Sequence, residues 1–263
     1  MSGTPVASGA TRDDWRINDL RLDQLLVERG LFPSREQARR AVMAGVVEVE
    51  GRRVDKPGTA VGEAARIDLL AREPFVSRAG KKLAHALDRF EIDPASWVCL
   101  DVGASTGGFT DCLLQRGAAR VYAVDVGYGQ LDQRLRQDPR VVVMERVNAR
   151  HLAADALPEP VRLAVFDLSF ISLAKVVPAI VPHVEPGGLL LPLVKPQFEA
   201  GRGAVGKGGI LRDGAVRAST VRSTAEALAG LGLELLGVED SAVPGAGGNR
   251  EAFALLRRPE AAA

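Results

Sequence analysis

A glycine-rich segment, residues 101–108, constrains the fold of this chain more than any other feature. It reads Asp-Val-Gly-Ala-Ser-Thr-Gly-Gly, follows an apolar run at residues 97–100 and precedes a helix-like stretch at residues 109–116. A second apolar run, residues 120–124, then leads to Asp125. A strand, a glycine loop, a helix, a second strand and an acid in this order are typical of a Rossmann-type unit that binds an adenine nucleoside.

The spacing of the glycines indicates which kind of nucleoside to expect. Gly103, Gly107 and Gly108 do not follow the Gly-x-Gly-x-x-Gly spacing of dinucleotide-binding proteins, so a pyrophosphate is not the expected ligand. Glycines still let the backbone approach a ligand closely, and Asp125 stands where a carboxylate can accept the protons of both ribose hydroxyls. A nucleoside without phosphates, such as S-adenosylmethionine, fits better, although the glycines could serve only the packing of an ordinary strand–helix turn.

The composition is that of a globular protein without a disulfide framework. The chain has 263 residues, of which 46% are hydrophobic and 25% are charged. The formal net charge is only +1, so a nucleic-acid-binding surface must come from a local cluster of basic residues. Cys99 and Cys112 are expected in the core, and the absence of paired cysteines and of zinc-ligand spacing suits the cytoplasm.

No segment predicts secretion, membrane insertion or metal binding. Residues 1–16 are polar and are expected to form a disordered tail rather than a signal peptide. The longest apolar run, residues 187–194, is too short to cross a bilayer. The three histidines lie far apart in the sequence and form no ligand motif, so no metal site is expected.

Residues 17–71 predict a small unit of helices and short strands. Apolar residues in the stretch 22–29 recur as on one face of an amphipathic helix. Ser34, with a glutamine three residues later, is typical of a capping box that begins a second helix over residues 35–44. Residues 46–50 then alternate as in a strand, and glycines mark the turns that follow.

This unit strongly resembles the αL RNA-binding module of small ribosomal-subunit protein four, which pseudouridine synthases and tyrosyl-tRNA synthetases share. The residues that carry the resemblance are Arg21-Leu22-Asp23, Gly30-Leu31, Pro33-Ser34-Arg35, Gln37-Ala38, Val54 and the glycines and valines of residues 45–51. In that family the second helix and the hairpin loop contact the RNA backbone. The resemblance therefore implies an RNA-binding face formed by Arg35, Arg39, Arg40, Arg52, Arg53 and Lys56.

Acidic and basic residues balance over this module, so RNA binding depends on how the basic residues cluster. Cations on phosphates displace counterions, which gives an affinity that depends strongly on salt and little on base sequence. The alternative is a solvated basic face of the kind found on many helices.

After a linker at residues 72–76, an α/β pattern extends over residues 77–263. Its strand candidates are residues 98–102, 121–125, 141–145, 163–167, 188–195, 233–238 and 252–256. Helical segments fall between most of them, which predicts a mainly parallel seven-stranded sheet. Residues 201–207 read Gly-x-x-x-x-Gly-Lys, but they lack the Ser or Thr of a phosphate-binding loop. We interpret them as a mobile loop that could contact RNA.

Four polar residues stand out against apolar or glycine-rich surroundings: Lys82, Asp167, Lys195 and Glu251. Asp167 and Lys195 each end a predicted strand, and the ligands of an open parallel sheet bind outside the carboxyl ends of its strands. Each residue alone is more often a structural cap or a solvated strand end. Together they indicate a catalytic group.

Four motifs in this part of the chain closely resemble the TlyA family, also called hemolysin A. They are Gly-Ala-Ser-Thr-Gly-Gly-Phe at residues 103–109, Asp-Val-Gly-Tyr-Gly-Gln-Leu at residues 125–131, Asp-Leu-Ser-Phe-Ile-Ser at residues 167–172 and Val-Lys-Pro-Gln-Phe-Glu at residues 194–199. That family joins the RNA-binding module to a methyltransferase domain of the FtsJ (RrmJ) type. The resemblance extends from about residue 20 over nearly the whole chain.

The resemblance implies a Rossmann-like class I methyltransferase with a mainly parallel seven-stranded sheet, preceded by a small α+β RNA-binding domain. It implies S-adenosylmethionine-dependent methylation of a ribose 2′-hydroxyl, with ribosomal RNA or ribosomal subunits as the partner. It also implies a catalytic tetrad of Lys82, Asp167, Lys195 and Glu251. Relatives have a single lysine where this chain has two in succession, so Lys81 stays an alternative to Lys82.

In this reaction Lys195 is expected to orient and deprotonate the hydroxyl or, if it stays charged, to stabilise the developing alkoxide. The residues expected to contact the cofactor are Gly103, Ala104, Ser105, Gly107, Gly108, Asp125, Asn148 and Asp167. Phe109, Phe170 and Phe198 lie near the expected site, and core packing is expected for at least two of them.

Three other functions fit parts of the sequence. A methyltransferase acting on a small molecule would not need the RNA-binding module. An assembly factor that binds RNA or ribosomes without catalysis would not need the tetrad. A membrane-active hemolysin would need a long apolar segment or a basic amphipathic helix, and neither is evident.

Overall fold

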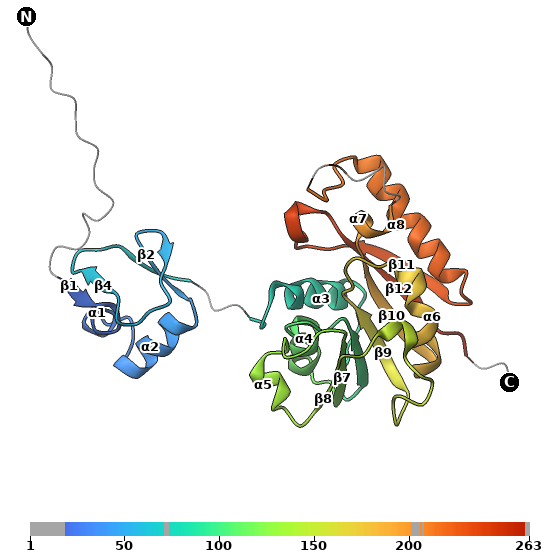
Figure 1. Cartoon of the computed structure of the whole chain (residues 1–263), viewed down its shortest axis with the longest axis horizontal. Helices are drawn as coiled ribbons and strands as arrows, with labels where there is room; N and C mark the ends of the chain where they lie inside the picture. The colour runs from blue at the N-terminus through green and yellow to red at the C-terminus, as the bar shows by residue number, and fades with distance from the viewer. Residues whose placement is uncertain (1–18, 71–73, 201–205, 207, 261–263) are drawn as a thin grey trace, which may run out of the picture. The chain divides into compact units, whose positions relative to one another are not determined.

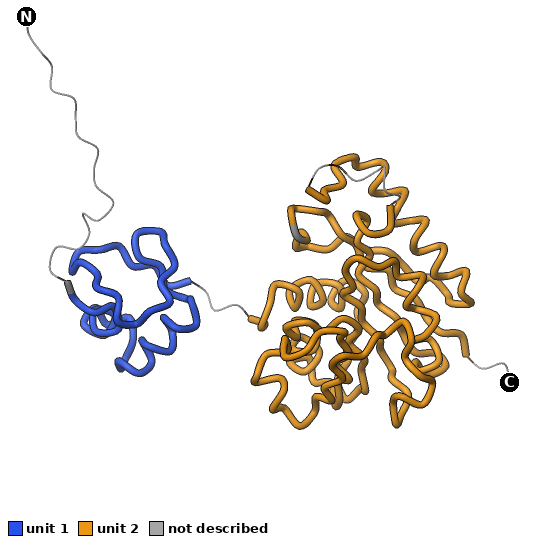
Figure 2. The backbone as a smooth tube through the Cα atoms, in the orientation of Figure 1, with its two compact units in different colours: residues 1–72 blue, residues 73–263 orange. Residues whose placement is uncertain are grey.

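The computed structural model describes residues 19–70, 74–200, 206 and 208–260 (Figure 1). The chain divides into two compact units, residues 1–72 and residues 73–263 (Figure 2). The first unit has one hydrophobic core, and the second unit has a core on each face of its sheet. The tail predicted at residues 1–16 and the Gly-x-x-x-x-Gly-Lys segment, apart from Gly206, lie outside the described residues.

The first unit packs two helices against short strands. Its elements are β1 (Asp19–Arg21), α1 (Leu22–Glu28), α2 (Arg35–Met43), β2 (Val47–Val49), β3 (Arg52–Arg53), β4 (Ala60–Gly62) and β5 (Ile67–Leu69). β1 pairs with β4, and β2 lies between β3 and β5, all antiparallel. The predicted N-cap of α2 is confirmed, because Ser34 Oγ accepts a hydrogen bond from the backbone N–H of Gln37 (3.3 Å).

The second unit is built on a seven-stranded sheet in the order β11-β12-β10-β9-β6-β7-β8. Its strands are β6 (Val98–Val102), β7 (Arg120–Asp125), β8 (Val141–Glu145), β9 (Val161–Phe166), β10 (Val184–Val194), β11 (Glu234–Asp240) and β12 (Ala252–Arg257). Neighbours from β10 to β8 are parallel, whereas β12 is antiparallel to both β10 and β11. The predicted mainly parallel sheet is therefore confirmed, with small differences at the strand ends.

Helices cover both faces of this sheet (Figure 1). They are α3 (Arg78–Arg89), α4 (Gly108–Gln115), α5 (Gln133–Arg136), α6 (Val177–Ile180) and α8 (Gly214–Ala229). A further single turn, α7 (Pro196–Glu199), follows the end of β10. Successive strand residues point to opposite faces, so Cys99 packs with α3, α4 and α5, while Leu100 packs with α6 and α8. Cys99 and Cys112 are buried as predicted, and burial raises the pKa of each thiol to about 12.

The direction of β12 decides which residues meet at one edge of the sheet. Because β12 runs against β10, its first residue lies at the edge where β9 and β10 end. The glycine turn that follows β6 lies at this same edge, since β6 is parallel to β9. The topology therefore gathers the turn, two strand ends and one strand start in one place.

Within the described residues, no helix is both long enough and apolar enough to cross a membrane. In the same part of the chain, no group of three or more His, Cys, Asp or Glu side chains could hold a metal ion.

Candidate active site

The turn between β6 and α4 adopts backbone conformations that glycine takes more easily than other residues. Gly103 and Gly107 have φ angles of +90° and +94°, in the left-handed region. A Cβ atom on Gly103 would lie 2.9 Å from the backbone oxygen of Asp167. A glycine at this position therefore permits the close approach between the turn and the end of β9.

A pocket of about 180 Å³ lies beside this turn. It is lined by Ser77, Ala79, Asp101, Gly103, Ala104, Ser105, Thr106, Gly108, Phe109, Asp167, Ser169 and Lys195. Most of the residues predicted to contact a cofactor are among them. Gly107 is not among them, and a Cβ atom on it would overlap the side chains of Leu131 and Leu135.

A smaller hollow of about 10 Å³ lies beside Asp125 at the end of β7. The Asp125 carboxylate accepts hydrogen bonds from the backbone N–H groups of Ser105 (2.8 Å) and Gly127 (2.7 Å), which hold it in place. The Ser105 hydroxyl donates a hydrogen bond to Gln130 Oε1 (3.4 Å), and both residues line the hollow. The two side chains are therefore in contact beside Asp125.

Asn148, predicted to approach an adenine ring, lines neither the pocket nor the hollow. It is exposed, and its Oδ1 accepts a hydrogen bond from the backbone N–H of Arg150 (3.1 Å), which caps the short turn that follows. Glu145, the last residue of β8, lines the hollow instead and accepts a hydrogen bond from the backbone N–H of Gly129 (2.8 Å). The hydrogen bond from Arg136 keeps the pKa of Glu145 below its ordinary value.

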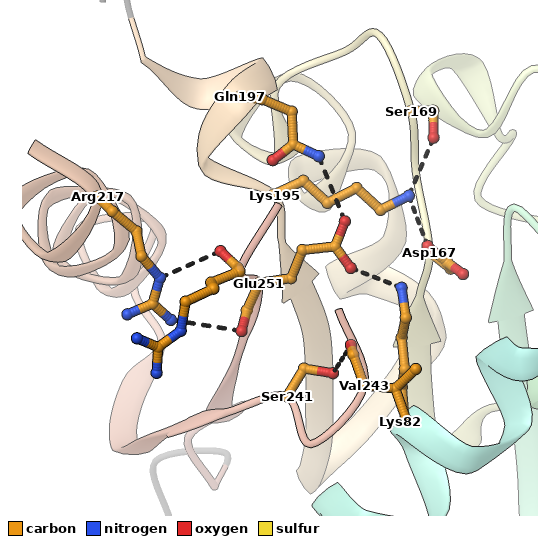
Figure 3. A network of polar contacts seen from close by, with 10 residues as sticks. Lys82, Asp167, Ser169, Lys195, Gln197, Arg217, Ser241, Val243 and Glu251 are labelled. Carbon is orange, nitrogen blue, oxygen red and sulfur yellow. Dashed lines mark hydrogen bonds and ion pairs between the residues drawn. The ribbon is translucent and has the colours of Figure 1, made fainter. Parts of the chain in front are cut away.

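The structure brings the four predicted catalytic residues together as two ion pairs (Figure 3). Lys82 Nζ lies 2.6 Å from Glu251 Oε2, and Lys195 Nζ lies 2.6 Å from Asp167 Oδ1. Lys82, Lys195 and Glu251 are only 8%, 9% and 2% exposed. Buried charges cost free energy unless they are paired, so the pairing explains how two lysines can lie inside the protein.

The position of each of these residues follows from the topology. Asp167 and Lys195 directly follow β9 and β10, and Glu251 directly precedes the antiparallel β12. Lys82 comes from α3, which packs on one face of the sheet. Its contact with Glu251 favours Lys82 over Lys81 as the member of the group.

Asp101 is a pocket residue that the sequence did not single out. Its side chain is fully buried, and its Oδ2 accepts hydrogen bonds from the backbone N–H (2.9 Å) and the hydroxyl (2.7 Å) of Thr110. Its Oδ1 has no hydrogen-bond partner among the described residues. Burial is the main cause that raises the pKa of Asp101 to about 7. An oxygen of this kind fits the ammonium group of a methionine moiety.

Two of the three phenylalanines near the site lie outside the core, so the expectation that at least two pack inside is wrong. Phe109 is buried and lies against Phe253. Phe170 is 90% exposed and has a φ angle of +63°. Its ring lies against that of the half-buried Phe198, with the ring centroids 4.8 Å apart. These two rings form an aromatic pair next to Ser169, which lines the pocket.

The predicted RNA-binding residues are all exposed on the first unit: Arg35, Arg39, Arg40, Arg52, Arg53 and Lys56. The three on α2 line a groove together with Glu36 and Met43, and Arg52 and Arg53 form β3. Arg35 also forms an ion pair with the buried Asp23 (3.2 Å), and Arg40 pairs with Glu36. Part of the positive charge on α2 is therefore balanced within the unit.

Comparison with known families assigns both units. Residues 75–258 match the FtsJ-like methyltransferase family, and residues 20–67 match the S4 domain. An S-adenosylmethionine dependent methyltransferase from Mesorhizobium loti has the same fold as the second unit, with a TM-score of 0.50 at 16% identity over 66% of this chain and 96% of that chain.

Proteins that match more than two thirds of this chain are also known. The 16S/23S rRNA (cytidine-2'-O)-methyltransferase TlyA of Mycobacterium tuberculosis (strain ATCC 25618 / H37Rv) is 49% identical over 239 residues, which are 90% of this chain and 89% of the relative. Hemolysin A of Brachyspira hyodysenteriae is 41% identical over 71% of this chain and 78% of its own. A solved structure from Streptococcus thermophilus, described as a candidate hemolysin, has a TM-score of 0.71 at 41% identity over 92% of this chain and 89% of that chain. The chain therefore belongs to the TlyA (hemolysin A) family of FtsJ-like methyltransferases.

Proposed function

We propose that this protein transfers a methyl group from S-adenosylmethionine to a ribose 2′-hydroxyl of ribosomal RNA. The observation that carries the proposal is the two lysine–carboxylate pairs at the sheet edge, in which both lysines are buried, next to a pocket bordered by the glycine turn. The name of the M. tuberculosis relative and the S4 match of the first unit support the RNA substrate. Since that substrate is part of the ribosome, we place the protein in the cytoplasm.

The residues around the pocket suit the methyl donor. Asp101 Oδ1 would accept a hydrogen bond from the ammonium group of its methionine part, and Gly103 lets the backbone approach that part closely. Asp125 would accept the protons of the ribose hydroxyls. When bound, this donor supplies an electrophilic methyl group, so the protein has to place the acceptor oxygen in line with it.

Lys195 is the group that we assign to the acceptor hydroxyl. Asp167 and Ser169 occupy two of the positions around its Nζ, with oxygens at 2.6 and 3.0 Å, and all three residues line the pocket. The remaining position can face a hydroxyl that enters the pocket. A charged Lys195 donates a hydrogen bond that stabilises the developing alkoxide. A neutral Lys195 accepts the proton of the hydroxyl.

The RNA itself would contact both units. The exposed arginines of α2 and β3 offer positive charge to phosphates without selecting a base sequence. Next to the pocket, the exposed ring of Phe170, supported by Phe198, offers a surface on which a base can stack.

Methyl transfer from labelled S-adenosylmethionine to purified ribosomal subunits tests the proposal. Label in ribosomal RNA, located on a 2′-oxygen by nuclease digestion and mass spectrometry, is the expected result. Lys195→Ala should abolish transfer because it removes the group that faces the hydroxyl, while binding of S-adenosylhomocysteine should survive. The exposed Lys175→Ala is the matched control and should keep full activity. Near-normal transfer by Lys195→Ala, or label only in small molecules, would contradict the proposal.

A further inference from the structure

The carboxylate of Glu251 is held through both of its oxygens (Figure 3). Oε2 accepts a hydrogen bond from Lys82 Nζ (2.6 Å), and Oε1 accepts one from Gln197 Nε2 (3.3 Å). The side chain of Glu251 is 2% exposed, so water contributes little to its solvation. A buried carboxylate oxygen without a donor costs more free energy than the hydrogen bond itself would contribute. The amide of Gln197 therefore matters for where this carboxylate lies.

Gln197 also belongs to the segment that carries Lys195. It lies in α7, a single turn that begins directly after Lys195 and is closed by the hydrogen bond from Phe198 N–H to the Lys195 carbonyl (2.9 Å). The hydrogen bond from Gln197 to Glu251 thus joins the segment of one ion pair to the carboxylate of the other. The amide oxygen of Gln197 cannot replace its NH₂ group in this contact, because two hydrogen-bond acceptors would then face each other.

Gly245 leaves the space that this arrangement needs. It is buried, and a Cβ atom on it would overlap the carboxylate of Glu251. Its φ angle lies outside the left-handed region, so the backbone itself would accept another residue. The hydrogen bond from Gly245 N–H to the Asn249 carbonyl (2.8 Å) fixes the loop at this distance. The carboxylate is therefore confined by packing as well as by hydrogen bonds.

The backbone of Glu251 is held separately, by Arg217 of α8. The guanidinium of Arg217 donates hydrogen bonds to the carbonyl oxygens of Arg250 (3.1 Å) and Glu251 (3.4 Å). A change at Gln197 or Gly245 would thus move the carboxylate of Glu251 while the start of β12 stays in place.

We propose that Gln197 is a positioning residue for methyl transfer. It fixes Oε1 of Glu251 and thereby the ion pair with Lys82, and Gly245 supplies the room for that carboxylate. This inference rests on the proposed function, since it assigns a role in that same reaction. It predicts that the two residues act through Glu251 and do not contact the methyl donor.

Steady-state kinetics with purified ribosomal subunits test the inference. Gln197→Ala should lower kcat about tenfold or more, which is the size of a lost hydrogen bond to a charged group. Its KM for S-adenosylmethionine should stay within about twofold, because Gln197 does not line the pocket. Gln133→Ala, the same change at an exposed glutamine, is the matched control and should leave both constants unchanged.

Gln197→Glu adds a pH profile that a merely structural role would not produce. The protonated acid has the shape of the amide and can donate to Glu251, whereas the ionised form repels it. Activity of this variant, relative to the native protein, should therefore fall as the pH rises. A constant ratio over the accessible pH range would contradict the proposed contact.

Gly245→Ala should lower kcat in the same way, because its methyl group displaces the same carboxylate. The double variant with Gln197→Ala should lower kcat little more than the more severe single change does, since both changes act on Oε1 of Glu251. Gly214→Ala, at a glycine whose Cβ would meet nothing, is the control. If the two changes lower kcat independently, so that their effects multiply in the double variant, the inference is wrong.

A crystal structure of Gln197→Ala separates failure of the inference from failure of the proposed function. The expected result is a Glu251 carboxylate displaced from Lys82, with the start of β12 unchanged. If Lys82 Nζ and Glu251 Oε2 are as close in the variant as in the native protein (2.6 Å), the inference is wrong, whatever the native protein methylates. If the native protein transfers no methyl group to ribosomal RNA, the proposed function fails, and the position of the carboxylate still decides the role of Gln197.

Discussion

Asp101 is the pocket residue whose ionisation is most directly open to measurement. Burial raises its pKa to about 7, and its free Oδ1 belongs to the pocket that we assign to the methionine part of the donor. A cation beside this oxygen favours the charged form of the carboxyl, so binding should draw a proton off Asp101. Affinity for S-adenosylhomocysteine should therefore rise from pH about 6 to pH about 8 and level off above it.

Isothermal titration calorimetry in buffers of different ionisation enthalpy measures both the affinity and the released proton. Asp101→Asn should weaken binding and remove this pH dependence, because an amide neither titrates nor attracts an ammonium group as strongly. Asp155→Asn, at an exposed acid, serves as the control. Affinity that does not change with pH in the native protein would contradict the assignment of Asp101.

Phe170 presents its ring to solvent although it is a large apolar residue. We expect Phe170→Ala to lower methyl transfer to ribosomal subunits about tenfold, because stacking on an aromatic ring is worth roughly 1–3 kcal/mol per base. Phe170→Trp should retain most activity, since it keeps a flat ring, and binding of S-adenosylhomocysteine should be the same in both variants. Full activity of Phe170→Ala would show that the exposed ring has another purpose.

The turn between β6 and α4 is the element that links the sheet to the pocket. In Gly103→Ala the new Cβ would meet the backbone oxygen of Asp167, and the residue would have to keep a φ angle of +90°. We expect a loss of about 1–3 kcal/mol in the free energy of unfolding, together with loss of cofactor binding. Urea titration and calorimetry measure the two effects, and Gly214→Ala, where there is open space, should show neither.

Apolar runs were enough to predict the seven strands of the sheet, because these strands bury residues on both of its faces. Most of the helices between them were predicted without bounds. The strand ends also predicted that Asp167 and Lys195 meet at one edge. Glu251 and Lys82 do not end a predicted strand. They stood out only as polar residues in glycine-rich or apolar surroundings, and the resemblance to a family was needed to assign them to a catalytic tetrad. The antiparallel direction of β12 explains afterwards why Glu251 lies at this edge.

The direction of a single side chain after a strand end could not be predicted in the same way. Asn148 lies three residues beyond the end of β8, where its side chain caps the next turn, and Glu145 is the residue of β8 that lies opposite Asp125 of β7. Asp101 was missed because the sequence does not show that Thr110 of α4 donates hydrogen bonds to Oδ2 of Asp101 and leaves Oδ1 without a partner among the described residues. Phe170 is exposed and has a positive φ angle, and no hydrophobic pattern indicates either property.

The whole molecule consists of two units with separate cores, and we expect the first to bind RNA through its exposed arginines and the second to bind the methyl donor and carry out methyl transfer. The predicted RNA-binding residues all lie in the first unit, and the pocket and both ion pairs lie in the second. Changes to the exposed arginines should therefore affect RNA affinity and leave the binding of the methyl donor intact.

The triple variant Arg39→Gln, Arg52→Gln, Arg53→Gln tests this division without touching Arg35, which holds the buried Asp23. It should weaken binding to ribosomal RNA, and each lost phosphate contact should reduce the slope of log affinity against log salt by about 1. Because the second unit is unchanged, S-adenosylhomocysteine should bind as tightly as to the native protein. Replacing Arg89, Arg257 and Arg162 of the second unit by Gln is the matched control, since each pairs with an acid there. An unchanged salt slope in the first variant would mean that these arginines form only a solvated face and that RNA is recognised elsewhere.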